Sequence, residues 1–319
     1  MSKIRLNDYS VIFISYDEPN ADHNWLDLKS MIHWAVRVNG IKGFAAAHRE
    51  AGRIANTDYV VTVDGDTIVH KNVLDHEIDI GDIDLSKSVC CWPTTNSVNG
   101  LTYANAGIKL WPRNVLLNLD THEYADKSNV CARIDYTGGK FTHIEMPPIY
   151  PHDKVTFISA KTFIDTTPLQ AWRAGFREGV KLSLFNGKVL ENPKRIWAGL
   201  LNRLAIWMTV GMDVQNGIWA IYGARLGCYL THFENFDVTK INNLDFLNDY
   251  FNKNISHMTE DEAYLKCLQL GSVIETKFKI AKPFSAEHSE FFKSFVPDPE
   301  KMLSAQLMEF VKAKEEYNV

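Results

Sequence analysis

Two aspartates stand one residue apart in the segment TDYVVTVDGDTIV, directly after a run of apolar and β-branched residues. Because Asp64 and Asp66 carry like charges, each raises the cost of ionising the other. Their carboxylate oxygens suit a hard divalent cation such as Mg²⁺ or Mn²⁺, which also binds phosphate oxygens. Gly65, between them, allows a backbone or a ligand to approach closely. The segment therefore predicts a cation site, with a solvated turn at a strand end as the alternative.

The elements that precede these acids indicate an α/β domain. Val11–Ile14 form an unbroken apolar run, which is typical of a strand buried on both faces. Residues 22–36 and the Ala-rich residues 44–56 are expected to be helical, before a second apolar strand that ends at the two aspartates. This alternation predicts a Rossmann-like, mostly parallel sheet flanked by helices. Since ligands bind at the carboxyl ends of such strands, the aspartates and Ser15–Glu18 are expected at the functional edge.

The last part of the chain is predicted to be mainly helical. Thr259 and Glu262 have the spacing of a capping box at the start of a helix, and residues 300–317 are amphipathic. We therefore predict an α/β domain over residues 1–235, followed by a helical C-terminal extension over residues 236–319.

The composition is that of an ordinary globular protein, because 319 residues with 45% hydrophobic and 23% charged side chains can bury a sizeable core. The formal charge of −5 gives no overall field that would attract nucleic acid or an anionic membrane. The five cysteines are odd in number and lack a C-x-x-C spacing, which argues against a disulfide framework or a zinc site. No apolar run reaches the roughly 18 residues of a membrane span, and residues 1–10 lack the apolar core of a signal peptide. We expect a cytoplasmic protein with no membrane partner.

The segment GIKGFAAAHREAGRIANTDYVVTVDGD resembles the stretch that leads into the D-x-D motif of glycosyltransferases with the A-type fold. The resemblance covers residues 10–235, and it implies an enzyme that moves a sugar from a UDP-sugar to an acceptor hydroxyl with Mn²⁺ or Mg²⁺ as cofactor. It implies that Asp66 binds the metal between the two phosphates, and that Asp64 contacts the ribose or supports the metal. For Asp17 the alternative is a turn residue, and for His48 an exposed helix position. The nucleotide contacts that the resemblance implies are Ser15, Tyr16, Asp17, Lys42 and His48.

A later segment, VGMDVQNGIWAIYGARLGCYLTH, is similar to a second block of this family, in which an acid begins a helix that is followed by a strand. We expect a turn at Gly211, then the helix and the strand. The family's usual Glu-Asp pair is Met212-Asp213 here, and in an inverting enzyme Asp213 would be the general base for the acceptor hydroxyl. The alternative is that Asp213 caps the helix. The resemblance also implies a histidine as a further metal ligand, His232 first and His152 second, with a structural histidine as the alternative.

A basic stretch over residues 172–203 carries seven Lys or Arg residues against two Glu, interleaved with aromatic residues. Such a stretch suits a phosphate backbone and stacked bases, and the alternative is a solvated helix face over a core. AWRAGFREGVK and NGIWAIYGARLG also look like segments of bacteriophage glycosyltransferases that modify hydroxymethylated DNA bases. This resemblance implies double-stranded DNA as partner, the 5-hydroxymethyl group of a pyrimidine such as hydroxymethylcytosine as acceptor, and the cytoplasm of a bacterial host. The predicted DNA contacts are Arg173, Arg177, Lys181, Lys194 and Arg195.

Other functions are alternatives at this point. A glycosyltransferase of this kind can act on a saccharide or a protein, and a nucleotide- or DNA-binding module can keep the acids without catalysis. Aspartyl-phosphate phosphatases also place a D-x-D motif after a strand. They require Thr or Val two positions beyond the second acid, where this chain has Ile68, and they place the motif on the first strand of the domain.

Overall fold

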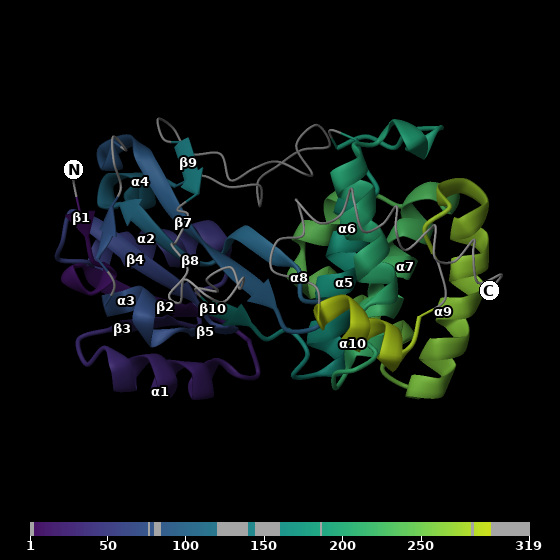
Figure 1. Cartoon of the computed structure of the whole chain (residues 1–319), viewed down its shortest axis with the longest axis horizontal. Coiled ribbons are helices and arrows are strands. Elements are labelled where there is room, and N and C mark those ends of the chain that lie inside the picture. The colour runs from purple at the N-terminus through teal and green to yellow at the C-terminus, as the bar shows by residue number, and fades with distance from the viewer. Residues whose placement is uncertain are drawn as a thin grey trace.

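The computed structural model describes residues 3–75, 77–79, 84–119, 140–143, 160–185, 187–281 and 284–294. It is an α/β structure with a mixed sheet flanked by helices, roughly compatible with a Rossmann-like fold. Figure 1 shows the sheet and its helices in one half of the molecule, and a group of helices from the later part of the chain in the other half.

The sheet combines parallel and antiparallel pairs. Strands β3 and β4 run parallel to β2 between them, as predicted, whereas β8 runs antiparallel to both of its neighbours, β4 and β7. The prediction of a mostly parallel sheet is confirmed only in part, because the sheet is mixed. A tight turn connects β7 directly to β8 and makes this pair antiparallel, where a parallel pair would need a long crossover. The order in space is β3 (Val36–Asn39), β2 (Ser10–Ser15), β4 (Tyr59–Asp64), β8 (Thr102–Pro112), β7 (Ser88–Asn96), β10 (Ala160–Thr162) and β5 (Thr67–Val69). Three short strands complete the described set: β9 (Lys140–His143), which pairs with β7, and β1 (Lys3–Ile4) with β6 (Ile78–Asp79).

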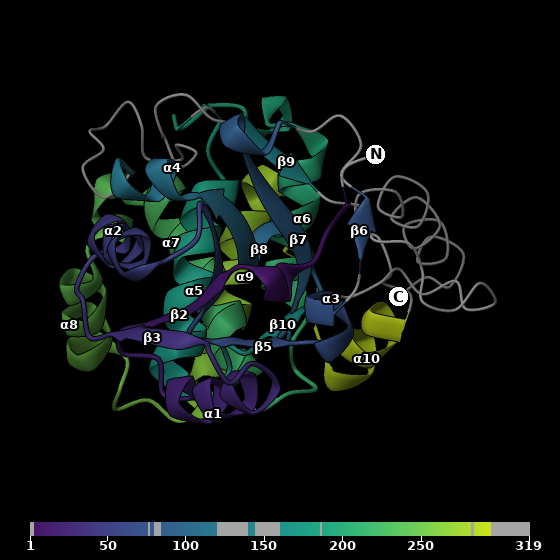
Figure 2. The ribbon, with the colours of Figure 1, turned by 90° about the vertical axis from the view of Figure 1, so that its left-hand side faces the viewer.

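The apolar strand β2 is buried on both faces, as its sequence predicts. Phe13 packs with Leu28 on one side of the sheet, whereas Ile12 packs with Ala47 and Ala51 on the other. Because successive side chains of a strand point to opposite faces, a strand covered on both sides must be apolar throughout. Figure 2 shows the two helices that cover β2 and β3 from opposite sides, α1 (Ala21–Met31) and α2 (Phe44–Ile54).

The first helix is shorter than predicted. The predicted helix over residues 22–36 ends at Met31, and Val36 instead begins the edge strand β3. The alternating sequence from Val36 to Asn39 buries Val38 and pairs with β2, which a continued helix would not do. Two further short helices lie in this half of the chain, α3 (Lys71–Asp75) and α4 (Arg113–Leu117).

The helical half is built around a close crossing of two helices. A Cβ atom on Gly175 or Gly179 would overlap the backbone carbonyls of Ala220 and Ala224, so these glycines let the two backbones touch. The described helices of this half are α5 (Pro168–Leu182), α6 (Ala198–Thr209), α7 (Gly217–Phe233), α8 (Leu244–Asn254), α9 (Glu260–Phe278) and α10 (Ala286–Ser294).

The helix α7 runs straight through the segment that was predicted to become a strand. Gly223 and Gly227 lie in this helix and pack against the backbone of α5, at Trp172 and Phe176. The predicted strand after Gly227 is therefore wrong. The glycines there serve close helix packing and do not end the helix.

One apolar core joins the helices from α5 to α9. It includes Trp172 of α5, Leu247 of α8 and Ile274 of α9, together with Val98 and Leu101 from the turn between β7 and β8. The helical assembly thus begins at α5, earlier in the chain than the predicted extension over residues 236–319.

Several smaller predictions can be compared with the described ranges. The capping box of Thr259 and Glu262 is confirmed at the start of α9. Cys90, Cys91, Cys228 and Cys267 are buried and free. Across the ranges that the structure describes, no helix combines the length and the apolar character needed to cross a bilayer. The predicted amphipathic segment over residues 300–317 lies outside the described residues.

Candidate functional site

The turn that carries the two aspartates is held in place by hydrogen bonds to its backbone carbonyl groups from both sides. β4 ends at Asp64, and the Gly65 carbonyl accepts a hydrogen bond from Asn24 Nδ2 of α1 at 3.0 Å. The Asp66 carbonyl accepts one from the Phe163 N–H, which follows β10, at 2.8 Å. The positions of both carboxylates are therefore set by the sheet edge rather than by a free loop.

Gly65 packs directly against the end of β2. A Cβ atom at this position would lie 2.9 Å from Ser15 Cβ and 2.7 Å from Glu18 Oε2, closer than real contacts allow. Gly65 was predicted to allow a backbone or a ligand to approach, and in the structure the groups that approach it are the side chains of Ser15 and Glu18. The close packing brings the carboxyl ends of β2 and β4 together, as expected for neighbouring parallel strands.

A third carboxylate, Glu18, joins the two aspartates. Burial raises the pKa of Glu18, and Asp17 and Asp64 add to this rise. Burial, followed by the charges of Asp64 and Glu18, raises the pKa of Asp66 to about 7. The site thus brings three carboxyl groups together and disfavours the ionised forms of Glu18 and Asp66, which is the condition that a bound cation relieves.

A buried lysine balances part of this charge. Lys109 lies in the middle of β8, its side chain is 3% exposed, and its Nζ is 3.7 Å from Asp64 Oδ2. Sequence reasoning missed Lys109, and it placed Glu18 at this edge of the sheet without giving it a role. The signal for Lys109 was a single charge inside an apolar strand, since a lysine is almost never fully buried without a partner.

The residues present suit a divalent cation by their chemistry, although they form no complete cage. Among the residues that the structure describes, no three His, Cys, Asp or Glu side chains meet in the arrangement of a metal site. Asp64 and Asp66 supply the oxygen atoms that Mg²⁺ and Mn²⁺ prefer. Mg²⁺ usually binds one or two carboxylates together with phosphate oxygens of a substrate, so two protein ligands suffice for a site that a diphosphate completes.

The predicted nucleotide contacts on β2 and after it lie beside the acids. Ser15 is buried and its Oγ donates a hydrogen bond to Asn39 Oδ1 at 2.8 Å, while Tyr16 is exposed. Asp17 forms an ion pair with Arg173 of α5, at 3.1 Å. The structure therefore brings Asp17 together with a residue that was predicted to contact DNA.

The two remaining predicted nucleotide contacts have different surroundings. Lys42 is exposed and forms an ion pair with Asp245 of α8. His48 is buried, contrary to the alternative of an exposed helix position, and it stacks on Phe44 with its Nδ1 2.9 Å from the Phe44 carbonyl oxygen. Burial lowers the pKa of His48 to about 4, while the charge of Asp64 opposes this change. His48 is therefore a neutral side chain beneath the acidic site.

The structure does not bring His232 to the aspartates. Its Nε2 lies 2.8 Å from the Ser183 carbonyl oxygen, and its ring packs edge-on against Phe278 of α9. Burial lowers the pKa of His232 to about 4. The prediction of His232 as a metal ligand is corrected here, because α7 continues as a helix and carries this residue into the helical core. His152, the second choice, lies outside the described residues.

The predicted DNA contacts do not gather into one free basic surface. Arg173 has a side chain that is 14% exposed and donates hydrogen bonds to Asp17 and to Asn248 Oδ1, while Lys181 pairs with Glu178 at 2.9 Å. The interleaved aromatic residues Trp172 and Phe176 belong to the apolar core. Of the others, Arg177 is partly buried on α5, Arg195 is exposed, and Lys194 has a side chain outside the described part.

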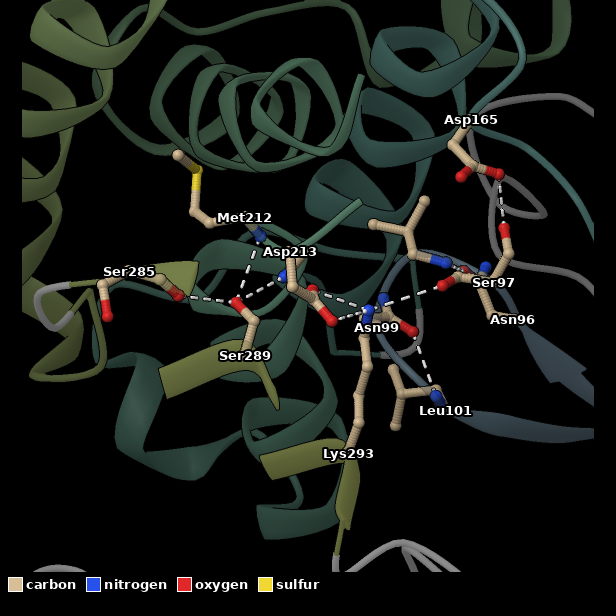
Figure 3. Close-up of polar contacts among 12 residues, drawn as sticks. Asn96, Ser97, Asn99, Leu101, Asp165, Met212, Asp213, Ser285, Ser289 and Lys293 are labelled. Carbon is tan, nitrogen blue, oxygen red and sulfur yellow. Dashed lines mark hydrogen bonds and ion pairs between the residues drawn. The ribbon is translucent and has the colours of Figure 1, made fainter. Parts of the chain in front are cut away.

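Asp213 lies in the turn between α6 and α7. The N-cap of α7 is Asn216, so the alternative that Asp213 caps this helix is wrong. Both carboxylate oxygens contact Lys293 Nζ of α10, at 2.7 and 2.9 Å (Figure 3). Sequence reasoning missed Lys293, which is 80 residues away in the chain.

No family model matches this chain, and no curated protein matches it.

Proposed function

We propose that this protein is a metal-dependent glycosyltransferase of the A-type fold, which transfers a sugar from a UDP-sugar to an acceptor hydroxyl. The observation that supports this most is the pair Asp64 and Asp66 at the carboxyl end of β4, where burial, followed by the charges of Asp64 and Glu18, raises the pKa of Asp66 to about 7. A divalent cation would balance this charge through carboxylate oxygens, and the phosphate oxygens of a diphosphate would fill its remaining coordination positions. The packing of Gly65 on Ser15 brings the ends of β2 and β4 together, and in this proposal the nucleoside would lie at the end of β2, beside the acids.

In this proposal Asp66 holds the cation and Asp64 supports it, with Lys109 compensating the charge of Asp64 from the core side. The bound cation would stabilise the negative charge that develops on the diphosphate as the sugar bond breaks. Tyr16 and Ser15, at the end of β2, would face the nucleoside. Asp213 would take the proton of the acceptor hydroxyl.

The proposed acceptor is the 5-hydroxymethyl group of a pyrimidine in double-stranded DNA, with a saccharide or protein hydroxyl as the alternative. The proposal of DNA relies on sequence resemblance. It receives less support from the side chains, since Arg173 and Lys181 are engaged with acids of the protein itself. A DNA surface would have to use other cations, such as the exposed Arg195.

The test is release of UDP from a panel of UDP-sugars in Mn²⁺, with and without hydroxymethylcytosine DNA. We expect release by the wild type and its loss in Asp66→Ala. Asp249→Asn, which changes an exposed aspartate on α8, is the matched control and should behave as the wild type. Turnover by Asp66→Ala in excess Mn²⁺ would refute the role of this residue. A wild type that binds UDP and releases none from any donor would favour a non-catalytic binding module.

A further inference from the structure

The acid proposed as general base is held by a residue from the last described helix. Lys293 Nζ contacts Asp213 Oδ1 at 2.7 Å and Oδ2 at 2.9 Å, and both side chains are mostly buried, 19% exposed for the lysine and 12% for the aspartate. A buried pair in this geometry fixes both side chains more firmly than a surface ion pair does.

The helix α10 also fixes the backbone that carries Asp213. The hydroxyl of Ser289 is completely buried and accepts hydrogen bonds from the N–H groups of Gly211 and Met212, at 3.0 and 3.1 Å. It donates in turn to the Ser285 carbonyl, at 2.8 Å. Figure 3 shows both contacts of α10 with this turn: Ser289 binds the backbone of Gly211 and Met212, and Lys293 binds the carboxylate of Asp213.

Lys293 connects Asp213 to the turn between β7 and β8. Its Nζ is 3.5 Å from the Ser97 carbonyl oxygen, and its stem packs at Gly100, where a Cβ atom would lie 3.2 Å from Lys293 Cγ. Gly100 has a φ of +74°, which suits glycine and lets this turn come close to the lysine. Lys293 therefore contacts the β7–β8 turn as well as the carboxylate of Asp213.

The same turn is tied to the strand that supports the aspartates. Ser97 Oγ donates to Asp165 Oδ1 at 2.6 Å, and the Ser97 N–H donates to the Thr162 carbonyl at 2.9 Å. Thr162 Oγ1 lies 3.2 Å from Thr67 Oγ1, next to Asp66. A continuous set of contacts therefore leads from Asp66, through the end of the sheet, to Lys293.

We propose that Lys293 is a positioning residue, which holds Asp213 at the acceptor side of the site; this inference rests on the proposed function. A carboxylate has about four lone-pair positions, and the lysine uses two, so one edge of Asp213 is left for an acceptor hydroxyl. The hydroxyl oxygen forms its bond to the anomeric carbon and gives its proton to Asp213. The bond from the anomeric carbon to the diphosphate breaks, and its electron pair leaves with the diphosphate.

The test compares Lys293→Met and Lys293→Arg with Glu290→Gln, an exposed control on the same helix. We expect Lys293→Met to lower kcat for transfer by about 100-fold, since a small misplacement of a catalytic group costs this much. The KM for the UDP-sugar and the affinity for UDP with Mn²⁺ should be unchanged, because the donor binds at the aspartates. Lys293→Arg should recover part of the lost rate, and Glu290→Gln should match the wild type.

A double-mutant cycle with Asp213→Asn separates positioning from a structural role. If Lys293 acts through Asp213, Lys293→Met lowers kcat no further when Asp213→Asn is already present. Additive losses in this cycle, or a wild-type kcat for Lys293→Met, would overturn the inference while the proposed function stands. A wild type that releases no UDP from any donor would overturn the proposed function and this inference together.

Discussion

Asp66 is a carboxyl whose ionisation the fold disfavours. Burial is the main cause of its raised pKa, and the carboxylates of Asp64 and Glu18 add to it. The turn cannot relax away from them, because Gly65 packs on the end of β2 and the carbonyls of the turn are hydrogen bonded. The crowded carboxyl groups therefore lower the stability of the native state, and a cation bound to them would raise it.

The raised pKa of Asp66 predicts a specific pH dependence of stability. Its pKa is 3.8 for the free side chain and about 7 in the fold, so the native state binds the proton more tightly than the unfolded state. The stabilisation by this proton is present below the lower value and is lost as the pH rises through the upper one. Asn has no such proton, so the free energy of unfolding of Asp66→Asn relative to the wild type should rise by about 1–2 kcal/mol from pH 5 to pH 8, after allowance for solvent screening.

Urea denaturation in EDTA at both pH values measures this difference. Asp249→Asn, with its exposed position on α8, is the control and should show no such rise. If the free energies of unfolding of Asp66→Asn and the wild type differ by the same amount at both pH values, the fold does not raise the pKa of Asp66.

At the residue level the sequence identified Asp64, Asp66 and Gly65 because they follow a recognisable strand. It placed Glu18 at this edge without a role and missed Lys109 and Lys293, because their roles depend on contacts between distant segments, which no local pattern records. His232 was predicted to be a metal ligand because its position was inferred from its order in the chain. In the structure its Nε2 instead contacts the Ser183 carbonyl oxygen.

The elements α5 and α7 depend on glycine for their contact. A Cβ atom on Gly175 would overlap the Ala220 carbonyl, and a backbone atom cannot move aside as a side chain can. Gly175→Ala should therefore lower the free energy of unfolding by about 3 kcal/mol, near the upper end of the usual cost of overpacking.

A second glycine provides the control for this effect. Gly199 of α6 also lies in a helix, and its nearest neighbours are atoms of the exposed Trp197 ring, which can shift. Gly199→Ala should change stability by less than about 1 kcal/mol, since alanine also favours the helix. Equal losses in the two variants, measured by urea denaturation, would show that the α5–α7 crossing is not the cause.

At the level of elements, the sequence predicted β2, β4, α2 and α9 because each has a clear apolar or small-residue pattern or a cap. The helix end and the strand that the second resembling segment implied around Gly227 are wrong, because α7 continues there. Glycine at a helix crossing and glycine after a helix have the same local sequence signal, and only the partner helix distinguishes them.

The two halves of the molecule share apolar residues at their junction. Val98 and Leu101 of the β7–β8 turn and Ile164 after β10 belong to the core formed by α5 to α9. The order of elements along the chain predicted the α/β class. It did not predict where the helical assembly begins, since that depends on which helices pack on α5.

This shared core predicts that the described halves unfold together. Far-ultraviolet circular dichroism and tryptophan fluorescence should give coincident urea transitions, because tryptophans lie in both halves, at Trp92 and Trp111 in the sheet and at Trp172 and Trp219 among the helices. Val98→Ala, at the junction, should shift both transitions equally. Two separate transitions would show that the halves are independent.

The central claim is that Asp66 binds a divalent cation together with a nucleoside diphosphate, and calorimetric titration of UDP tests it most directly. We predict that UDP binds the wild type and Asp249→Asn in Mn²⁺, that EDTA abolishes binding, and that Asp66→Asn does not bind UDP in Mn²⁺ although it is folded. Equal UDP affinity in Asp66→Asn and the wild type, or UDP binding that does not depend on Mn²⁺, would contradict the account.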